Sequence, residues 1–339
     1  MRSWLNKSEV IFKNIASTLY NEFALSKASV NTALEITDDA IHSLSLKQLS
    51  NGCYQLIDIN TLKLDQPLFD GETIRDSEKL ASTFSTLVKH TKSKENAIAL
   101  ALPVNRIFSQ VISVDKSLED VLLEEKVHQS IETYFSYKPD QIYYDYQLVD
   151  PLAENQKASL LFVAAHKDIV NQYLRFAKLL NCQLTTLDVY HYALYRLVQK
   201  AIWGNKLKTN EAIVLIDARK HAITVTLLIE NQLPTFCETM PITKDEASEM
   251  LNKQLPWLKR TLNMAYASLD ASLTRPLIYL CGELEELENI KNTLSLALEM
   301  EVRLFNPFDY LSIEIDQKIT INNPYQYLIP LSLALRKEL

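Results

Sequence analysis

The stretch "VLIDARKHAITVTLLIE", residues 214 to 230, reads as two β-strands joined by a tight turn. The first strand runs into an acid, Asp217, and the second consists of β-branched and aliphatic residues. In nucleotide-binding folds a hairpin of this shape often surrounds a phosphate, with glycine at the turn so that backbone N–H groups can approach the anion. Here the turn reads Ala218, Arg219, Lys220 and His221. The hairpin therefore has the outline of a phosphate loop without its glycine.

The composition of the chain is that of a globular protein. Its 339 residues, of which 47% are hydrophobic, are enough for two domains or for one large domain with an insertion. The net charge of -7 and the lack of a basic cluster argue against a nucleic-acid partner, because phosphate contacts need a clustered basic surface. We find no signal peptide and no apolar run of membrane-spanning length, so we expect a cytoplasmic protein. Four scattered cysteines lack the spacing of a zinc site and are expected to be reduced: Cys53, Cys182, Cys237 and Cys281.

Glycine is scarce in this sequence. Only four glycines occur, at positions 52, 71, 204 and 282, whereas roughly 7% is usual in proteins. Neither G-x-x-x-x-G-K-[ST] nor G-x-G-x-x-G is present, and these glycine-rich loops are how most nucleotide sites approach phosphates. The P-loop and Rossmann classes of nucleotide enzyme are therefore disfavoured.

The pattern of predicted elements repeats in the two halves of the chain. Strand-like segments at 30–37, 40–50 and 53–64 predict an antiparallel meander, and the segments from 212 to 240 predict a second one. Each half then closes with helix, strand and helix, and each opening strand carries one acid near its end, Glu35 or Asp217. This duplication predicts an α/β (α+β) protein with the two-lobed organisation of the actin, Hsp70 and sugar-kinase ATPase fold.

We expect the following division of the chain. An N-terminal extension at 1–29 contains an amphipathic helix at 9–23, whose narrow apolar stripe suits docking on its own domain or contact with a partner or membrane. The first lobe comprises 30–103 and 176–203, and a small α+β insertion occupies 104–175. The second lobe comprises 204–339, with a return to the first lobe as an alternative for the C-terminal helix at 327–338.

Several segments of the sequence resemble the family of the type IV pilus assembly protein PilM. "ALPVNRIFSQVISV" with the acidic helix after it, "LLFVAAHKDIVNQYLRFAKLLNCQLTTLDVYHYALYRL", and "LIYLCGELEELENIKNTLSLALEMEVRLFNPF" are similar to family segments in the same order and spacing, and so is the final "YLIPLSLALR". The resemblance runs from about residue 30 to the C-terminus. It implies an actin-like fold and a place in the cytoplasmic part of a pilus machine, peripheral at the inner membrane.

The departures from the family pattern all fall on the nucleotide-binding loops. The first hairpin has Glu35, Thr37, Asp38 and Asp39 where the family has Asp-x-Gly, and the second keeps Asp217 but has Arg219 and Lys220. Micromolar affinity for ATP needs about 8 kcal/mol, and three altered loops would remove on the order of 5 kcal/mol. We therefore expect weak Mg·ATP binding or none, no catalytic residue, and no metal except Mg²⁺ near Asp217 if nucleotide binds. The turn expected at the adenosine carries Cys281, Gly282 and Glu283 in place of several glycines.

The resemblance implies a non-catalytic scaffold. Its expected partners are the cytoplasmic N-terminal peptide of a PilN-like inner-membrane protein and the pilus motor ATPases. The alternatives are an ATP-binding enzyme of the actin and sugar-kinase superfamily and the cytoplasmic actin-like module of type II secretion. The resemblance implies that the peptide groove lies between the insertion at 104–175 and the first lobe, where an extended peptide could pair with a strand edge and place alternate side chains in apolar pockets. Candidate lining residues, which could equally form the insertion's own core, are Ile107, Phe108, Tyr134, Phe135 and Tyr137.

Overall fold

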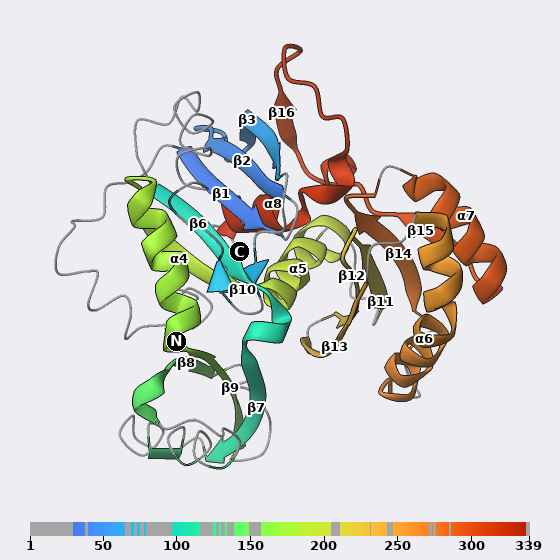
Figure 1. The fold of residues 1–339 in the computed structure, drawn as a ribbon, viewed down its shortest axis with the longest axis horizontal. Helices are drawn as coiled ribbons and strands as arrows, with labels where there is room; N and C mark the ends of the chain where they lie inside the picture. The colour runs from blue at the N-terminus through green and yellow to red at the C-terminus, as the bar shows by residue number, and fades with distance from the viewer. Residues whose placement is uncertain are drawn as a thin grey trace.

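The structure is a computed structural model. It describes residues 30–37, 40–64, 69–70, 73–74, 78, 97–115, 125–126, 129, 133, 139–148, 157–204, 211–230, 232–242, 247–270, 273, 276–284 and 286–336. Several predictions lie outside these residues: the N-terminal extension at 1–29, the carboxylates Asp38 and Asp39, and the aromatic residues Tyr134, Phe135 and Tyr137. Two large sheets stand side by side with helix α5 between them, and a small sheet lies beneath the first (Figure 1).

The first large sheet has the strand order β10-β6-β1-β2-β3-β16. Its opening strands β1, β2 and β3 are antiparallel neighbours, whereas β6 pairs parallel with β1 and β10 pairs parallel with β6. Strand β1 is apolar along most of its length and buried, as expected for a central strand covered on both faces. The strands are β1 (Val30–Ile36), β2 (Ala40–Gln48), β3 (Tyr54–Lys63), β6 (Ala97–Leu102) and β10 (Gln183–Val189).

The second large sheet repeats this arrangement in the order β13-β12-β11-β14-β15. Strands β11, β12 and β13 are antiparallel, and β14 and β15 continue the sheet in parallel from β11. Apart from β16 (Ile313–Ile315), which extends the first sheet beside β3, both sheets have the strand order 3-2-1-4-5 when their strands are counted along the chain. The predicted duplication and the equivalence of the two opening meanders are therefore confirmed. The strands are β11 (Ala212–Ala218), β12 (Ala222–Ile229), β13 (Gln232–Pro241), β14 (Leu277–Gly282) and β15 (Val302–Leu304).

One hydrophobic core joins the two lobes. It contains Leu44 of the first sheet, Leu215 of the second, and residues of α5 and α8. Helix α5 contacts strands of both lobes and packs against α8, and a π-helical turn at Gln199–Trp203 ends it. The helices that cover the sheets are α4 (Lys167–Leu179), α5 (Tyr190–Val198), α6 (Ala247–Ala267), α7 (Leu287–Leu298) and α8 (Leu328–Ala334).

The described part of the insertion contains a three-stranded antiparallel sheet in the order β7-β9-β8. Helix α4 follows it and covers the first lobe, since Val170, Tyr173 and Phe176 are fully buried in the same core as Leu34 and Leu100 of that lobe. The expected boundary at residue 175 therefore cuts a continuous helix, and the structure puts the end of the insertion near residue 166. Its strands are β7 (Phe108–Asp115), β8 (Ile142–Leu148) and β9 (Lys157–His166).

The C-terminal part of the chain returns to the first lobe. Helix α8 packs on β1, β2 and β6, and Asn31 Nδ2 donates to the Ala334 carbonyl at 3.1 Å. Strand β16 (Ile313–Ile315) also joins the first sheet, parallel to β3, so more of the segment at 204–339 leaves the second lobe than expected. The remaining short elements are β4 (Phe69–Asp70), β5 (Thr73–Ile74) and the 3-10 turns Val104–Arg106, Pro139–Gln141, Pro307–Asp309 and Pro324–Gln326.

Candidate functional site

The two opening hairpins face each other across the cleft between the lobes. In the first, Thr37 N donates to the Ala40 carbonyl at 2.9 Å, and in the second, Arg219 N donates to the Ala222 carbonyl at the same distance. Thr37 and Arg219 therefore hold equivalent places, each directly after the opening strand. By the same equivalence Glu35 corresponds to Asp217, so the duplicated fold brings one carboxylate from each half to the cleft.

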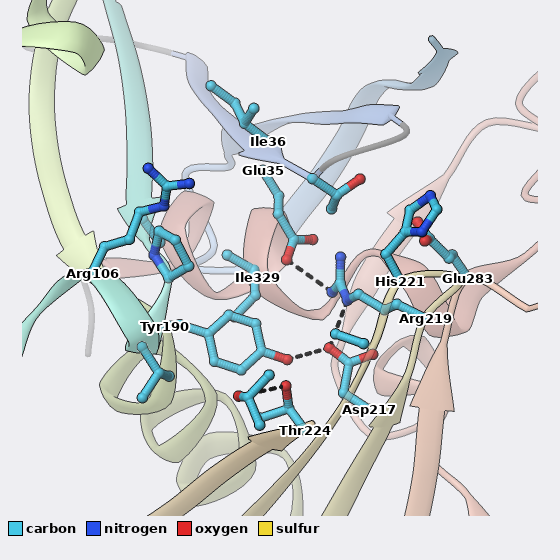
Figure 2. Close-up of a pocket in the computed structure, with 16 residues that line it drawn as sticks. Glu35, Ile36, Arg106, Tyr190, Asp217, Arg219, His221, Thr224, Glu283 and Ile329 are labelled. Atoms are coloured by element: carbon cyan, nitrogen blue, oxygen red, sulfur yellow. Dashed lines mark hydrogen bonds and ion pairs between the residues drawn. The ribbon is translucent and has the colours of Figure 1, made fainter. Parts of the chain in front are cut away.

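Arg219 lies between these two carboxylates. Its Nη2 is 2.8 Å from Glu35 Oε1, and its Nε donates to Asp217 Oδ2 at 2.8 Å. Figure 2 shows the guanidinium reaching out from the second hairpin to the acid of the first. Glu35 and Asp217 are buried and the Arg219 side chain is 14% exposed, so all three groups are largely desolvated and depend on one another. The position that carries glycine in a phosphate loop thus carries a group that fills the space between the loops.

Tyr190, the first residue of α5, completes this cluster. Its hydroxyl donates to Asp217 Oδ2, the same oxygen that accepts from Arg219 Nε (Figure 2). Burial, together with the charge of Asp217, raises the pKa of Tyr190 well above its ordinary value, so this hydroxyl remains a donor. In the sequence, Tyr190 follows the acid Asp188 in the motif "LDVY" at the end of a buried strand. Its contact with Asp217 could not be predicted from that motif, because the contact depends on where α5 lies.

A second polar contact crosses the cleft beside the first. His42 of β2 is 1% exposed, and its Nε2 lies 3.4 Å from Glu283 Oε2, directly after β14. The His42 Nδ1 atom is 2.9 Å from Thr61 Oγ1, which also contacts the Tyr327 hydroxyl at 2.8 Å. A neutral imidazole with its proton on Nε2 satisfies both contacts, and burial lowers the pKa of His42 accordingly.

Glu283 is held by donors from both lobes. Besides His42, the backbone N–H of Lys220 donates to its Oε1 at 3.3 Å. Burial alone would raise its pKa, but the hydrogen bond with His42 and the charge of Arg219 outweigh burial and bring the pKa to about 2. Glu35 behaves in the opposite way. Its burial outweighs the attraction of Arg219, with Asp217 and Glu283 adding repulsion, and its pKa rises to about 8.

The turn after β14 is constrained by close packing. Gly282 has a φ of 131°, and a Cβ atom at this position would lie 2.0 Å from the Ala218 carbonyl oxygen. Cys281, one residue earlier, is 1% exposed in the core beneath the cleft. The glycine is therefore required by the packing of β14 on β11, and the thiol of Cys281 is not presented to the cleft.

The cleft holds a cavity of about 170 Å³. Typical ligand pockets enclose roughly 300–1,000 Å³. Ile36, Pro103 and Ile329 supply apolar walls, and the acids Glu35, Asp217 and Glu283 also line the cavity. The Arg219 guanidinium thus lies between the two turns, and the cavity beside it is lined by three acids and by Arg106.

The described candidates for the peptide groove are packed inside the protein. Phe108 lies against Phe162 in the core of the insertion, with ring centroids 6.1 Å apart. Ile107 packs against the core that the first lobe shares with α4. Both are partly buried, so each has a structural role whatever else it contacts.

Two duplicated sheets with paired acidic hairpins at their cleft define a protein of the actin-like ATPase fold. The chain belongs to the family of the type IV pilus assembly protein PilM, whose model matches residues 33–237. This match confirms the resemblance seen in the sequence. No curated protein sequence matches the chain significantly.

Three solved structures illustrate the likeness. One is a PilM–PilN type IV pilus biogenesis complex, with 17% identity, a TM-score of 0.73, and coverage of 91% of this chain and 98% of that one. Another is the ethanolamine utilization protein EutJ from Carboxydothermus hydrogenoformans, with 11% identity, a TM-score of 0.49, and coverage of 95% and 96%. The third is the cytoplasmic domain of EpsL, an inner-membrane component of the type II secretion system of Vibrio cholerae, with 8% identity, a TM-score of 0.46, and coverage of 91% and 94%.

Proposed function

We propose that this chain is a non-hydrolysing actin-like scaffold of a type IV pilus assembly machine. The observation that carries the proposal is Arg219, which lies between Glu35 and Asp217 at the place where two phosphate loops would hold a nucleotide. A triphosphate would have to displace a buried guanidinium from two carboxylates and then lie beside those carboxylates. Both steps oppose binding, although Arg106 also lines the cavity as a second cation.

The proposed partner is an extended peptide from the cytoplasmic N-terminus of a PilN-like inner-membrane protein. A solved structure of similar fold is a PilM–PilN complex, and membership of the PilM family makes the same kind of partner reasonable here. The small sheet has β7 at one side, and no described strand pairs with its outer edge. An added strand could pair there, with Val111, which is 40% exposed, as a contact for an apolar side chain.

Recruitment by such a peptide would place the protein on the cytoplasmic side of the inner membrane. Among the described residues no helix is long and apolar enough to span a membrane. Attachment through a partner is the arrangement we propose, and the pilus motor ATPases are proposed as further partners on the same assembly.

Calorimetric titrations test the two halves of this proposal separately. With Mg·ATP we expect no binding tighter than about 1 mM, and with a PilN-type N-terminal peptide we expect saturable binding. Val111→Asp should weaken the peptide by about tenfold or more, because a carboxylate is placed at an apolar contact. Ile315→Asp is the matched control, since Ile315 is 41% exposed on β16, another edge strand. Micromolar Mg·ATP binding would contradict the proposed lack of nucleotide binding. Equal effects of the two substitutions would contradict the proposed peptide site at β7.

A further inference from the structure

Among the residues that the structure describes, three polar side-chain contacts cross the cleft, and each joins the first lobe to the second. Arg219 binds Glu35, Tyr190 donates to Asp217, and His42 contacts Glu283. We infer that these contacts form an internal lock that keeps the two lobes closed with no ligand between them. The lock does not depend on the proposed peptide partner, because none of its members belongs to the insertion.

The central element of the lock is the geometry of the Arg219 guanidinium. A guanidinium is planar and presents donors on several edges, so one group can bind two carboxylates that come from different directions. Here Nη2 serves the acid of the first lobe and Nε serves the acid of the second. The fold places two acids on opposite sides of the cleft. Asp217 repels the ionised form of Glu35, and the Arg219 cation between them offsets part of that repulsion.

The lock is asymmetric between the two halves of the duplicated fold. Thr37 holds the place in the first hairpin that Arg219 holds in the second, but its hydroxyl donates to the Ala40 carbonyl of its own turn at 3.1 Å. Of these two equivalent residues, Arg219 reaches across the cleft to Glu35, whereas the hydroxyl of Thr37 stays within its own turn. A single residue of the second hairpin therefore carries the central connection.

The outer contact is anchored on both sides. On the second lobe, Glu283 accepts from the backbone N–H of Lys220, within the same turn that carries Arg219. On the first lobe, Thr61 links His42 to the Tyr327 hydroxyl and accepts from Gln326 Nε2 at 3.1 Å. Gln326 and Tyr327 directly precede α8, so the lock is connected to the segment that returns to the first lobe.

A ligand can shift an equilibrium between two arrangements only by binding one of them better than the other. In a two-lobed cleft, a ligand that touches both lobes favours closure for this reason. Arg219 makes both contacts from within the chain, so closure here requires no such ligand. We therefore expect a scaffold whose lobes have the same arrangement whether or not nucleotide is present.

Hydrogen–deuterium exchange and small-angle X-ray scattering test this lock. The amides to follow are those of Thr37 and Arg219, which close the two turns. In the wild type both should exchange slowly, and neither exchange nor the radius of gyration should change with millimolar Mg·ATP. In Arg219→Gln both amides should exchange roughly 10- to 100-fold faster, with an increased radius of gyration, because charge-assisted contacts across the cleft are lost.

Two further variants make the test decisive. Glu35→Gln/Arg219→Gln removes both charges of the central pair, so it avoids leaving that carboxylate unpaired if the single variant fails to fold. It should still show fast turn exchange. Arg303→Gln, which breaks a pair with Glu301 within the second lobe, should leave exchange and radius unchanged. Wild-type protection in the double variant, or slowing of wild-type exchange by Mg·ATP, would overturn the lock. Loss of peptide binding alone would bear on the proposed function and not on closure.

Discussion

Arg219 and Glu35 come from opposite halves of the chain, yet Arg219 Nη2 lies 2.8 Å from Glu35 Oε1, in a largely buried pair that becomes a full ion pair when Glu35 ionises. Asp217 binds the same guanidinium from the other side. A buried pair of this kind is weak support for stability, because the desolvation of each charge offsets the attraction. Removing one member of the pair should cost more, because the other charged group then stays desolvated without a partner. The pH dependence of stability reports how the acids of the cleft ionise.

Glu35 should make the protein less stable as the pH rises. Its folded pKa of about 8 is above the ordinary value of 4.5, so its stabilising contribution is complete below pH 4.5 and is lost between pH 4.5 and 8. Glu35→Gln cannot ionise and should reduce this decline by several kcal/mol. Urea unfolding at pH 5, 6.5 and 8 measures the effect, with the exposed Glu314→Gln as control. If the free energy of unfolding of Glu35→Gln falls with pH as steeply as that of the wild type, Glu35 does not change its ionisation in this pH range.

Glu283 should have the opposite dependence on pH. Its folded pKa of about 2 is below the ordinary value of 4.5, so its contribution is present above pH 4.5 and is lost as the pH falls from 4.5 to 2. Glu283→Gln should lower the free energy of unfolding at pH 7 by up to about 3 kcal/mol. The loss should be much smaller at pH 3, where wild-type Glu283 has already lost part of its advantage. Equal losses at both pH values would contradict this account.

Gly282 should not tolerate a side chain. A Cβ atom would lie 2.0 Å from the Ala218 carbonyl oxygen, and the φ of 131° is unfavourable for other residues. Gly282→Ala should therefore destabilise the fold by roughly 3 kcal/mol or more. Gly52→Ala is the control, because Gly52 also has a positive φ, 82°, but no atom lies within 4 Å of the added carbon. It should lose only about 1–2 kcal/mol, as measured by chemical unfolding.

Asp188 should be essential for the attachment of the C-terminal helix. This carboxylate is fully buried and binds Arg196 of α5 and Arg336, which lies 3.4 Å away beyond α8. Burial alone would raise its pKa, but the two arginines lower it below the ordinary value. Asp188→Ala leaves two cations unpaired and should destabilise by roughly 3–5 kcal/mol.

Arg336→Ala provides the graded comparison for Asp188, because Arg196 still pairs with the acid. Its loss should be smaller, about 1–2 kcal/mol. Chemical unfolding of both variants gives the order. A larger loss for Arg336→Ala than for Asp188→Ala would mean that the arginine acts mainly through packing and not through this ion pair.

Much of the fold is predictable from local patterns in the sequence. The meanders at 30–64 and 212–240 follow from runs of β-branched and aliphatic residues bounded by tight turns, and their repetition indicates the duplication. The scarcity of glycine and the arginine at position 219 also indicate an altered phosphate loop. The C-terminal limit of the insertion is harder to predict, because helix α4 is amphipathic whether it packs on the insertion or on the first lobe.

The sequence by itself therefore determined the two-lobed architecture, the family and the position of each hairpin, because strand periodicity, turn chemistry and segment order are properties of consecutive residues. Only the tertiary structure decided that Arg219 turns toward Glu35, that His42 meets Glu283, and that Tyr190 binds Asp217. Each of these contacts joins residues of different lobes. Their partners and the opposite pKa shifts of Glu35 and Glu283 depend on how far the lobes close and on how deeply each acid is buried.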